Sequence, residues 1–231
     1  MSSRMCFARI AGALLAIAAL PAIAQTDLAV TSILAPQSGC ALNATENVSV
    51  RLFNYGSTLP AGTSFNAVYT INAGASVVEL ITLASPMTSN SELTYTFTTQ
   101  ANLSTAGSYT FDARVALAGD ISPANDTFAG FVVTNSAPSV GGSVSGTSGP
   151  TLSGSVTLSG HTGSVIEWQQ SDDGGLRWRR LSNTTTTQDF DQLREHTQFR
   201  ALVRNGPCAP ALSNPQLVLS SDPIFYSGFE P

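Results

Sequence analysis

The sequence predicts an all-β protein built from two β-sandwiches in tandem. Apolar residues alternate with polar ones at every second position, and no stretch after residue 24 keeps a helical period over eleven residues. Turn sequences interrupt this alternation, such as Asn-Tyr-Gly at 54–56 and Asn-Ala-Gly at 72–74. Near the middle, the composition shifts to Ser, Gly, Pro and Thr, which separates two regions of strands. Short strands with frequent turns are typical of sandwiches.

Residues 1–24 are predicted to be a cleaved signal peptide. Arg4 and Arg9 give a positive start, residues 10–20 are apolar, and Ala-Ile-Ala at 22–24 offers a cleavage site. A bilayer span needs about twenty apolar residues, and no later segment is long and apolar enough. We therefore expect an exported protein, secreted or at the cell surface, with no membrane span.

The charge of the chain is acidic. Its net charge is −5, and removal of Arg4 and Arg9 with the signal peptide gives −5 − 2 = −7. Because nucleic acids and anionic lipids repel negative charge, we expect neither as the main partner, and we expect no cofactor. Export also permits disulfide bonds.

The predicted organisation after the signal peptide has four parts. These are a first sandwich at 25–135, a linker at 136–149, a second sandwich at 150–220 and a C-terminal tail at 221–231. In the first sandwich Val48, Val50 and Leu52 share one strand face. In the second region, strands are expected at 151–158, 165–169, 177–181, 198–204 and 216–219.

A repeated spacing points to the type of sandwich. Leu103 precedes Tyr109 by six residues, and Leu193 precedes Phe199 by six. This resembles the corner before strand F of immunoglobulin-like (Ig-like) sandwiches, where a Tyr hydroxyl bonds back to the chain. Phe199 lacks that hydroxyl, so its corner can keep only the packing. Trp168 occupies the place of a core Trp on strand C. The prediction is therefore two tandem Ig-like sandwiches.

Both halves resemble bacterial Ig-like domains. The second half resembles a bacterial Ig-like repeat over 158–181, with further matches at 183–187 and 199–203. The first half resembles the cell-adhesion-related (CARDB-type) domain, and the segments that carry this likeness are Asp27–Val30, Ser38–Cys40, Glu46–Val50, Asn54–Gly56 and Asn125–Asp126. The resemblance implies a secreted bacterial surface protein and does not specify a ligand.

A short stretch raises the question of glycosidase activity. Ser171, Asp173, Gly175 and Trp178 resemble the Asp box of bacterial sialidases, with Arg177 in place of the usual Thr. A sialidase would carry several boxes around a propeller, together with an Arg cluster and a Tyr–Glu pair. A single box in a sandwich is better explained as a hairpin turn. We therefore predict no catalytic residues.

Two side-chain clusters are weaker candidate sites. Asp120, Asn125 and Asp126 could supply oxygens to Ca²⁺, but their side chains supply too few, so we interpret them as turn caps and predict no metal site. A second cluster is basic and could bind acidic glycans or carboxylates. Its alternative is cross-strand pairing with Glu167, Asp189 or Asp191. The basic residues are Arg177, Arg179, Arg180, Arg200 and Arg204.

The two cysteines outside the signal peptide are Cys40 and Cys208, one in each predicted sandwich. In Ig topology the loop that holds Cys40 lies at the exit pole of the first sandwich, and the loop that holds Cys208 lies at the entry pole of the second. The two thiols could therefore pair across the junction if their Cα atoms come within about 7 Å. The alternative is two free or intermolecularly paired thiols.

The function predicted from these observations is non-catalytic. We expect an exported Ig-like protein that acts in adhesion or as a binding or spacer module, with an unidentified protein or glycan at the cell surface as its partner. The alternative is a glycan-binding accessory module or a sialidase-like protein. The ending Ile-Phe-Tyr-Ser-Gly-Phe-Glu at 224–230 resembles a short ending of secreted gammaproteobacterial proteins, and could be a docking segment or a tail folded onto the second sandwich.

Overall fold

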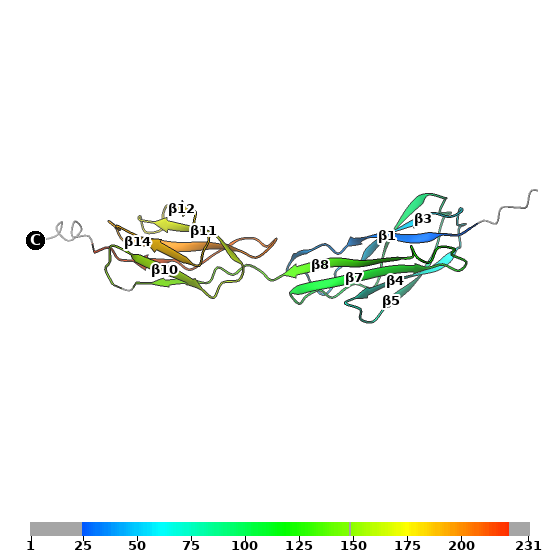
Figure 1. Ribbon diagram of the computed structural model, residues 1–231, viewed down its shortest axis with the longest axis horizontal. Helices are drawn as coiled ribbons and strands as arrows, with labels where there is room; N and C mark the ends of the chain where they lie inside the picture. The colour runs from blue at the N-terminus through cyan, green and yellow to red at the C-terminus, as the bar shows by residue number, and fades with distance from the viewer. Residues whose placement is uncertain (1–24, 148, 222–231) are drawn as a thin grey trace, which may run out of the picture.

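The computed structural model describes residues 25–147 and 149–221, and all regular elements in these ranges are β-strands. Two sandwiches lie end to end along the long axis of the molecule (Figure 1). The predicted signal peptide and the tail from residue 222 onward lie outside the described residues. Within the described ranges, no helix has the length and apolar character needed to cross a membrane.

The first sandwich packs a three-stranded sheet against a five-stranded sheet. The smaller sheet has the order β1-β3-β6, and the larger has the order β2-β8-β7-β4-β5. All pairings are antiparallel except that of β2 with β8, which is parallel. The strands are β1 (Leu28–Ala35), β2 (Gly39–Cys40), β3 (Ser49–Asn54), β4 (Ser64–Ile71), β5 (Val77–Thr82), β6 (Ser91–Thr96), β7 (Gly107–Ala116) and β8 (Thr127–Ser136).

Alternation along each strand builds the core of this sandwich. Val50 and Leu52 on β3 are buried, with Val48 just before the strand, whereas the residues between them are only partly covered. Phe111, Ala113 and Val115 on β7 approach them from the opposite sheet within one hydrophobic cluster. Because successive strand residues point to opposite faces, this pattern requires two layers with their apolar faces together.

The second sandwich is smaller and has the same plan. A three-stranded sheet has the order β13-β10-β9, and it faces a sheet of order β12-β11-β14-β15 in which β16 also pairs with β14. The strands are β9 (Ser143–Gly146), β10 (Gly154–Ser159), β11 (Ser164–Ser171), β12 (Arg179–Leu181), β13 (Thr187–Phe190), β14 (Thr197–Arg204), β15 (Ala211–Leu212) and β16 (Gln216–Val218).

Aromatic side chains form the centre of the second core. Trp168 on β11 is fully buried, as the sequence predicted, and its indole N–H donates to the carbonyl of Thr185 at 2.8 Å. Phe199 on β14 stacks on Phe190 of β13, with ring centroids 5.4 Å apart. A buried indole needs a hydrogen-bond partner, so the bond to Thr185 fixes the chain that enters β13.

The strand plan makes both units Ig-like sandwiches, the predicted fold class. In the first sandwich β1, β3 and β6 form one sheet, and in the second β9, β10 and β13 form the corresponding sheet; the other strands of each sandwich form the facing sheet. The predicted corner is present in the first sandwich, where the Tyr109 hydroxyl donates to the carbonyl of Thr105 at 2.6 Å. At the equivalent corner of the second sandwich, the side chains of Leu193 and Phe199 pack into the core, and Phe199 has no hydroxyl that could form the equivalent bond.

The structure corrects the predicted linker at 136–149. Residues 143–146 form β9, which pairs with β10, and Val140 forms a bridge with Thr162. The second sandwich therefore begins well before residue 150. The Ser and Gly residues of this short strand concealed it, because only Val144 contributes a buried apolar side chain. The sequence also missed β13 and β15, of four and two residues, which are too short to show clear alternation.

Candidate functional site

The Asp-box residues form a tight turn between β11 and β12. Gly174 and Gly175 have φ angles of 73° and 92°, which favour glycine. The Ser171 hydroxyl donates to Asp173 Oδ1 at 2.8 Å and accepts the Gly175 N–H at 2.9 Å. Asp173 Oδ1 also accepts the Arg177 N–H at 2.8 Å. This backbone bond, followed by the bond from Ser171, lowers the pKa of Asp173 below its usual value. Asp173 therefore organises the turn.

Trp178 covers this turn and supports an arginine. Its indole N–H donates to the carbonyl of Gly175 at 3.0 Å. The guanidinium carbon of Arg200 lies 3.7 Å from the centre of the ring, a cation–π contact. Arg200 Nε also donates to Gln169 Oε1 at 2.7 Å. Burial lowers the pKa of Arg200 from its ordinary value. The aromatic ring therefore holds one guanidinium in place on the outer sheet face.

Most of the basic cluster is not neutralised. Of the predicted partners only Glu167 is used, and its Oε2 lies 3.5 Å from Arg180 Nε. Among the described residues, Arg177 and Arg179 form no ion pair. The alternative of cross-strand pairing thus holds for Arg180 alone. Arg177, Arg179 and Arg204 have exposed side chains, whereas Arg200 is held by Gln169 and Trp178.

Two clefts that share lining residues border these arginines. The larger, of about 520 Å³, lies between the edges of β12 and β13, with Leu181 and Phe190 among its lining residues. The smaller, of about 190 Å³, is lined by Arg177 and Trp178. Gln170, Asp172 and Arg179 line both. Sequence analysis did not single out Gln170, because an isolated Gln on a strand carries no signal of a cleft.

Of the three calcium candidates, only Asp120 is seen to cap backbone N–H groups, whereas Asn125 Oδ1 and Asp126 Oδ1 are buried without a hydrogen-bond partner in the described part of the chain. The two carboxylate oxygens of Asp120 accept the N–H groups of Leu28 and Ser122, each at 2.8 Å, and Asn125 Nδ2 donates to Asp27. Burial, together with the charges of Asp120 and Asp27, raises the pKa of Asp126. In the ranges 25–147 and 149–221, no group of three or more His, Cys, Asp or Glu side chains is arranged to hold a metal ion.

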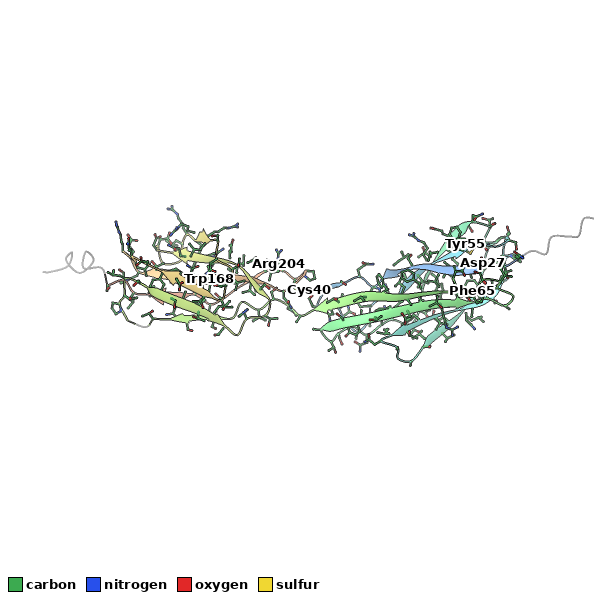
Figure 2. All side chains as sticks on the ribbon, in the orientation of Figure 1. Asp27, Cys40, Tyr55, Phe65, Trp168 and Arg204 are labelled. Atoms are coloured by element: carbon green, nitrogen blue, oxygen red, sulfur yellow. A yellow bond between two sulfur atoms is a disulfide. The ribbon has the colours of Figure 1, made fainter. Side chains whose placement is uncertain are left out.

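A disulfide joins the two sandwiches. Cys40 and Cys208 are bonded, with Cα atoms 5.0 Å apart, within the usual range for disulfides. Cys40 lies on β2, which pairs with the end of β8, so it lies beside the point where the chain leaves the first sandwich. Figure 2 shows it at the junction, with Arg204 of β14 on the side of the second sandwich. The structure thus pairs the two cysteines, whose loops were expected at the facing poles of the two sandwiches.

Hydrogen bonds also hold the connecting segment. The Asn205 N–H donates to Ser139 Oγ at 2.9 Å, and its side-chain amide donates to the carbonyl of Ala137 at 2.8 Å. Gly206 has a φ of 52°, and a Cβ at this position would lie 2.8 Å from Ser136 Oγ. The turn after β14 is therefore packed directly against the connector, a close approach that glycine permits.

A network in the first sandwich was not predicted. Glu79 on β5 accepts hydrogen bonds from the Tyr95 hydroxyl at 2.6 Å, from the Thr98 N–H and hydroxyl, and from the Thr99 N–H. Burial raises its pKa, but these bonds outweigh that effect and lower the pKa to about 2. Burial, and then the hydrogen bond to Glu79 and its charge, raise the pKa of Tyr95 to about 12. Glu79 thus ties the edge of one sheet to the segment after β6.

Comparisons with known proteins give a match over the second sandwich. Residues 139–221 match a family described as a domain of unknown function (DUF8696). This match begins inside the predicted linker, in agreement with the early start of the second sandwich. No curated protein matches the chain.

Two solved structures are similar to the chain at low identity. One is that of domains A168–A170 from titin, with 14% identity and a TM-score of 0.44; the match covers 84% of this chain and 66% of the length of that one. The other is that of the chicken CNTN1 FN1–FN3 domains, with 10% identity, a TM-score of 0.29 and coverage of 85% and 69%.

Proposed function

We propose that this chain is an exported, non-catalytic Ig-like protein that acts in adhesion or as a binding and spacer module. The observation that carries the proposal is the junction, where a disulfide joins the two sandwiches and two hydrogen bonds from Asn205 hold the segment that connects them. A fixed junction keeps the outer ends of the sandwiches at a constant separation. A spacer needs that property, whereas a flexible linker would make the separation vary.

Small-angle X-ray scattering of the oxidised protein tests the spacer role. One elongated conformation should fit the data, with the same maximum dimension at low and high salt. A Cys40→Ser/Cys208→Ser double variant should need a range of bent conformations. An oxidised protein that already samples bent forms would contradict the proposal.

Export from a bacterial cell is part of this proposal. It is supported by the charged and apolar pattern of residues 1–24 and by the CARDB-type segments of the first sandwich. An interdomain disulfide also suits an oxidising compartment. Fusion of residues 1–24 to alkaline phosphatase, which is active only after export, should give activity in bacterial cells. Deletion of residues 10–20 should abolish it; equal activity from both fusions would argue against the signal peptide.

The absence of catalysis is supported by the use of the Asp box as a turn. Asp173, its central carboxylate, accepts two hydrogen bonds that hold the hairpin. We expect no turnover of sialosides or of a broad panel of aryl glycosides. Release of the aryl group that disappears in an Asp173→Asn variant of unchanged fold would contradict this expectation.

A second candidate function is recognition of acidic glycans by the second sandwich. Arg177 and Arg179 border two clefts, and Trp178 and Gln170 add groups that suit sugar faces and hydroxyls. A glycan array should then show signals for carboxylated or sulfated glycans that fall at least tenfold in an Arg177→Ala/Arg179→Ala variant. Arg114→Ala, an exposed cation of the first sandwich, is the matched control and should leave the signals unchanged.

A further inference from the structure

The disulfide creates a short covalent route from one end of the molecule to the other. The bonded cysteines are 168 residues apart in sequence. Of the described chain, only residues 25–40 and 208–221 lie outside the closed loop, which is 16 + 14 = 30 residues. A pull on the two ends follows the shortest covalent path, so it passes through these two segments and the disulfide.

We propose that the Cys40–Cys208 disulfide makes this protein a tension-bearing tether, in which an end-to-end pull bypasses the cores of both sandwiches. The inference deepens the proposed spacer role, on which it rests. It adds that the spacing is kept under load. The loop from 41 to 207 contains β3 to β14, and therefore nearly all of both hydrophobic clusters.

The first loaded segment is already extended. It contains β1, which pairs with β3 from Leu28 opposite Asn54 to Ala35 opposite Ser49, and then β2, which ends at Cys40. Figure 2 shows Asp27 at the outer end of the first sandwich and Cys40 at the junction. A β-strand rises about 3.2–3.4 Å per residue, close to the maximum of about 3.3–3.6 Å, so the strand part of this segment can lengthen little.

The second loaded segment continues the same line. After Cys208 the chain forms β15, opposite Leu202 and Val203 near the junction end of β14. It then forms β16, in which Val218 pairs with Thr197 at the other end of β14. The segment therefore runs from the junction to the outer end of the second sandwich, as Figure 1 shows. Both loaded segments lie along the long axis of the molecule.

The outer ends of the two loaded segments are anchored to neighbouring elements. The Leu28 N–H donates to Asp120 Oδ2, and the Thr26 hydroxyl donates to the carbonyl of Gly119 at 2.6 Å. At the other end, the Thr151 N–H donates to the carbonyl of Leu219 at 2.9 Å. A pulling force at either end thus acts first on these hydrogen bonds, and after they break it acts on the covalent path through the disulfide.

Single-molecule force spectroscopy of the chain from residue 25, with handles at its two ends, tests the proposal. The oxidised protein should show no long gain in contour length. After reduction, or in a Cys40→Ser/Cys208→Ser variant, unfolding should release the 168-residue loop, about 550–600 Å of contour. A long gain in the oxidised protein would overturn the proposal. Circular dichroism before pulling establishes that the reduced protein is folded.

A second pulling geometry separates load bypass from general mechanical strength. Handles placed at the turns of Gly74 and Gly174 pull on the closed loop itself. Two covalent paths then join the handles: the direct chain, and a path through the disulfide. In the oxidised protein the path through the disulfide is the shorter, at (74 − 40) + (208 − 174) = 68 residues, so extension should stop at about 220–245 Å. The reduced protein should extend over 174 − 74 = 100 residues, about 330–360 Å.

The outcomes of this control are distinct. Resistance of the oxidised protein in both geometries would mean that the bond only strengthens the fold, and the proposal would be wrong. A long end-to-end gain combined with rigid, elongated scattering would remove the load path but leave the spacer role. Bent conformations in scattering, together with a short end-to-end gain, would remove the spacer role and leave the load path.

Discussion

The two sandwiches share one type of hydrogen bond at an equivalent strand and differ in the contacts that surround it. On β4 of the first sandwich and β11 of the second, a buried aromatic residue donates a hydrogen bond to a backbone carbonyl. In the first it is Tyr69, whose hydroxyl donates to the carbonyl of Thr99 at 3.0 Å, and in the second it is Trp168, which donates to Thr185. In the first sandwich the Tyr69 ring contacts Phe97 and Phe111, and the Glu79 network lies nearby. In the second, the Phe190–Phe199 stack is accompanied by a buried bond from the Ser220 hydroxyl to the carbonyl of Leu193.

The clefts at the open sides of the two sandwiches differ in their lining. Both have a cleft between the edges of their two sheets, of about 420 Å³ in the first and about 520 Å³ in the second. In the first, side chains such as Leu83, Met87 and Leu93 line it. In the second, the lining includes Arg179 and Gln188. One strand plan therefore supports an apolar cleft beside a carboxylate network, and a charged cleft suited to polar ligands.

Truncation of the second core should have the largest effect. Trp168→Ala should destabilise the second sandwich by about 3–5 kcal/mol, because it removes a fully buried indole and leaves a cavity. Hydrogen exchange measured by mass spectrometry should show lost protection in residues 140–147 and 149–221 and retained protection in 25–135. Phe111→Ala is the matched change in the first core and should give the reverse pattern. Loss across both sandwiches from either change would show that they unfold as one unit.

Removal of the carboxylate network should affect only the first sandwich. Glu79→Gln should lower its free energy of unfolding by about 1–2 kcal/mol, because charge-assisted hydrogen bonds become neutral ones. Glu92→Gln, which removes an exposed partner of Arg51, is the control and should change stability by less than about 0.5 kcal/mol.

The Glu79 contribution should depend on pH. Its folded pKa of about 2 is below the ordinary value of 4.5, so the stabilisation is fully present above pH 4.5 and is lost as the pH falls toward 2. Urea unfolding between pH 6 and pH 2 should show the difference between the wild type and Glu79→Gln shrink over that window. A difference that is constant with pH would refute the charge-based explanation.

The corner hydroxyl should contribute a smaller amount. Tyr109→Phe should destabilise the first sandwich by about 0.5–1 kcal/mol through loss of the bond to Thr105, and should make this corner resemble that of Phe199. Tyr55→Phe removes a hydroxyl from an exposed ring and serves as the control. Equal melting temperatures for wild type and Tyr109→Phe would mean that packing alone fixes both corners.

Relief of backbone strain at Ala73 should have the smallest effect. Ala73 has a φ of 53° in the β4–β5 turn, where an L side chain is strained, whereas Gly174 occupies φ 73° in the Asp-box turn. Ala73→Gly should stabilise by about 0.5 kcal/mol, and Gly174→Ala should destabilise by about 1 kcal/mol. A Cβ at Gly174 would meet no atom within 4 Å, so its cost reports backbone strain alone. Thermal melts of both variants measure these shifts.

The sequence predicted the features that depend on local pattern. Alternation placed Val48, Val50 and Leu52 on one face, and the six-residue spacing located the Tyr109 corner. The glycines of the Asp box likewise identified a turn. Each of these follows from neighbours in the chain, where periodicity and turn chemistry act directly.

Features that depend on distant partners could not be predicted in this way. Glu79 on an alternating strand has the pattern of a solvated residue, and nothing local indicates that Tyr95 and Thr98 approach it. The cysteine pairing stayed open because residues 136–149 had the composition of a long linker, whereas β9 shortens the connection. Cleft residues such as Gln170 depend on where two sheet edges separate, which is set by the whole sandwich.

The position of Cys40 also has a consequence for biosynthesis. A chain that emerges with its N-terminus first exposes this thiol 168 residues before Cys208. At roughly 5–20 residues per second, the delay is about 8–34 s, long enough for the first sandwich to fold around a reduced cysteine. In the folded protein, the turn after β14 places Cys208 against the carbonyls of Ser136 and Ala137, which brings its sulfur to Cys40. A chain truncated before residue 208 would therefore keep Cys40 as a free thiol, which separates it from the complete, bonded chain.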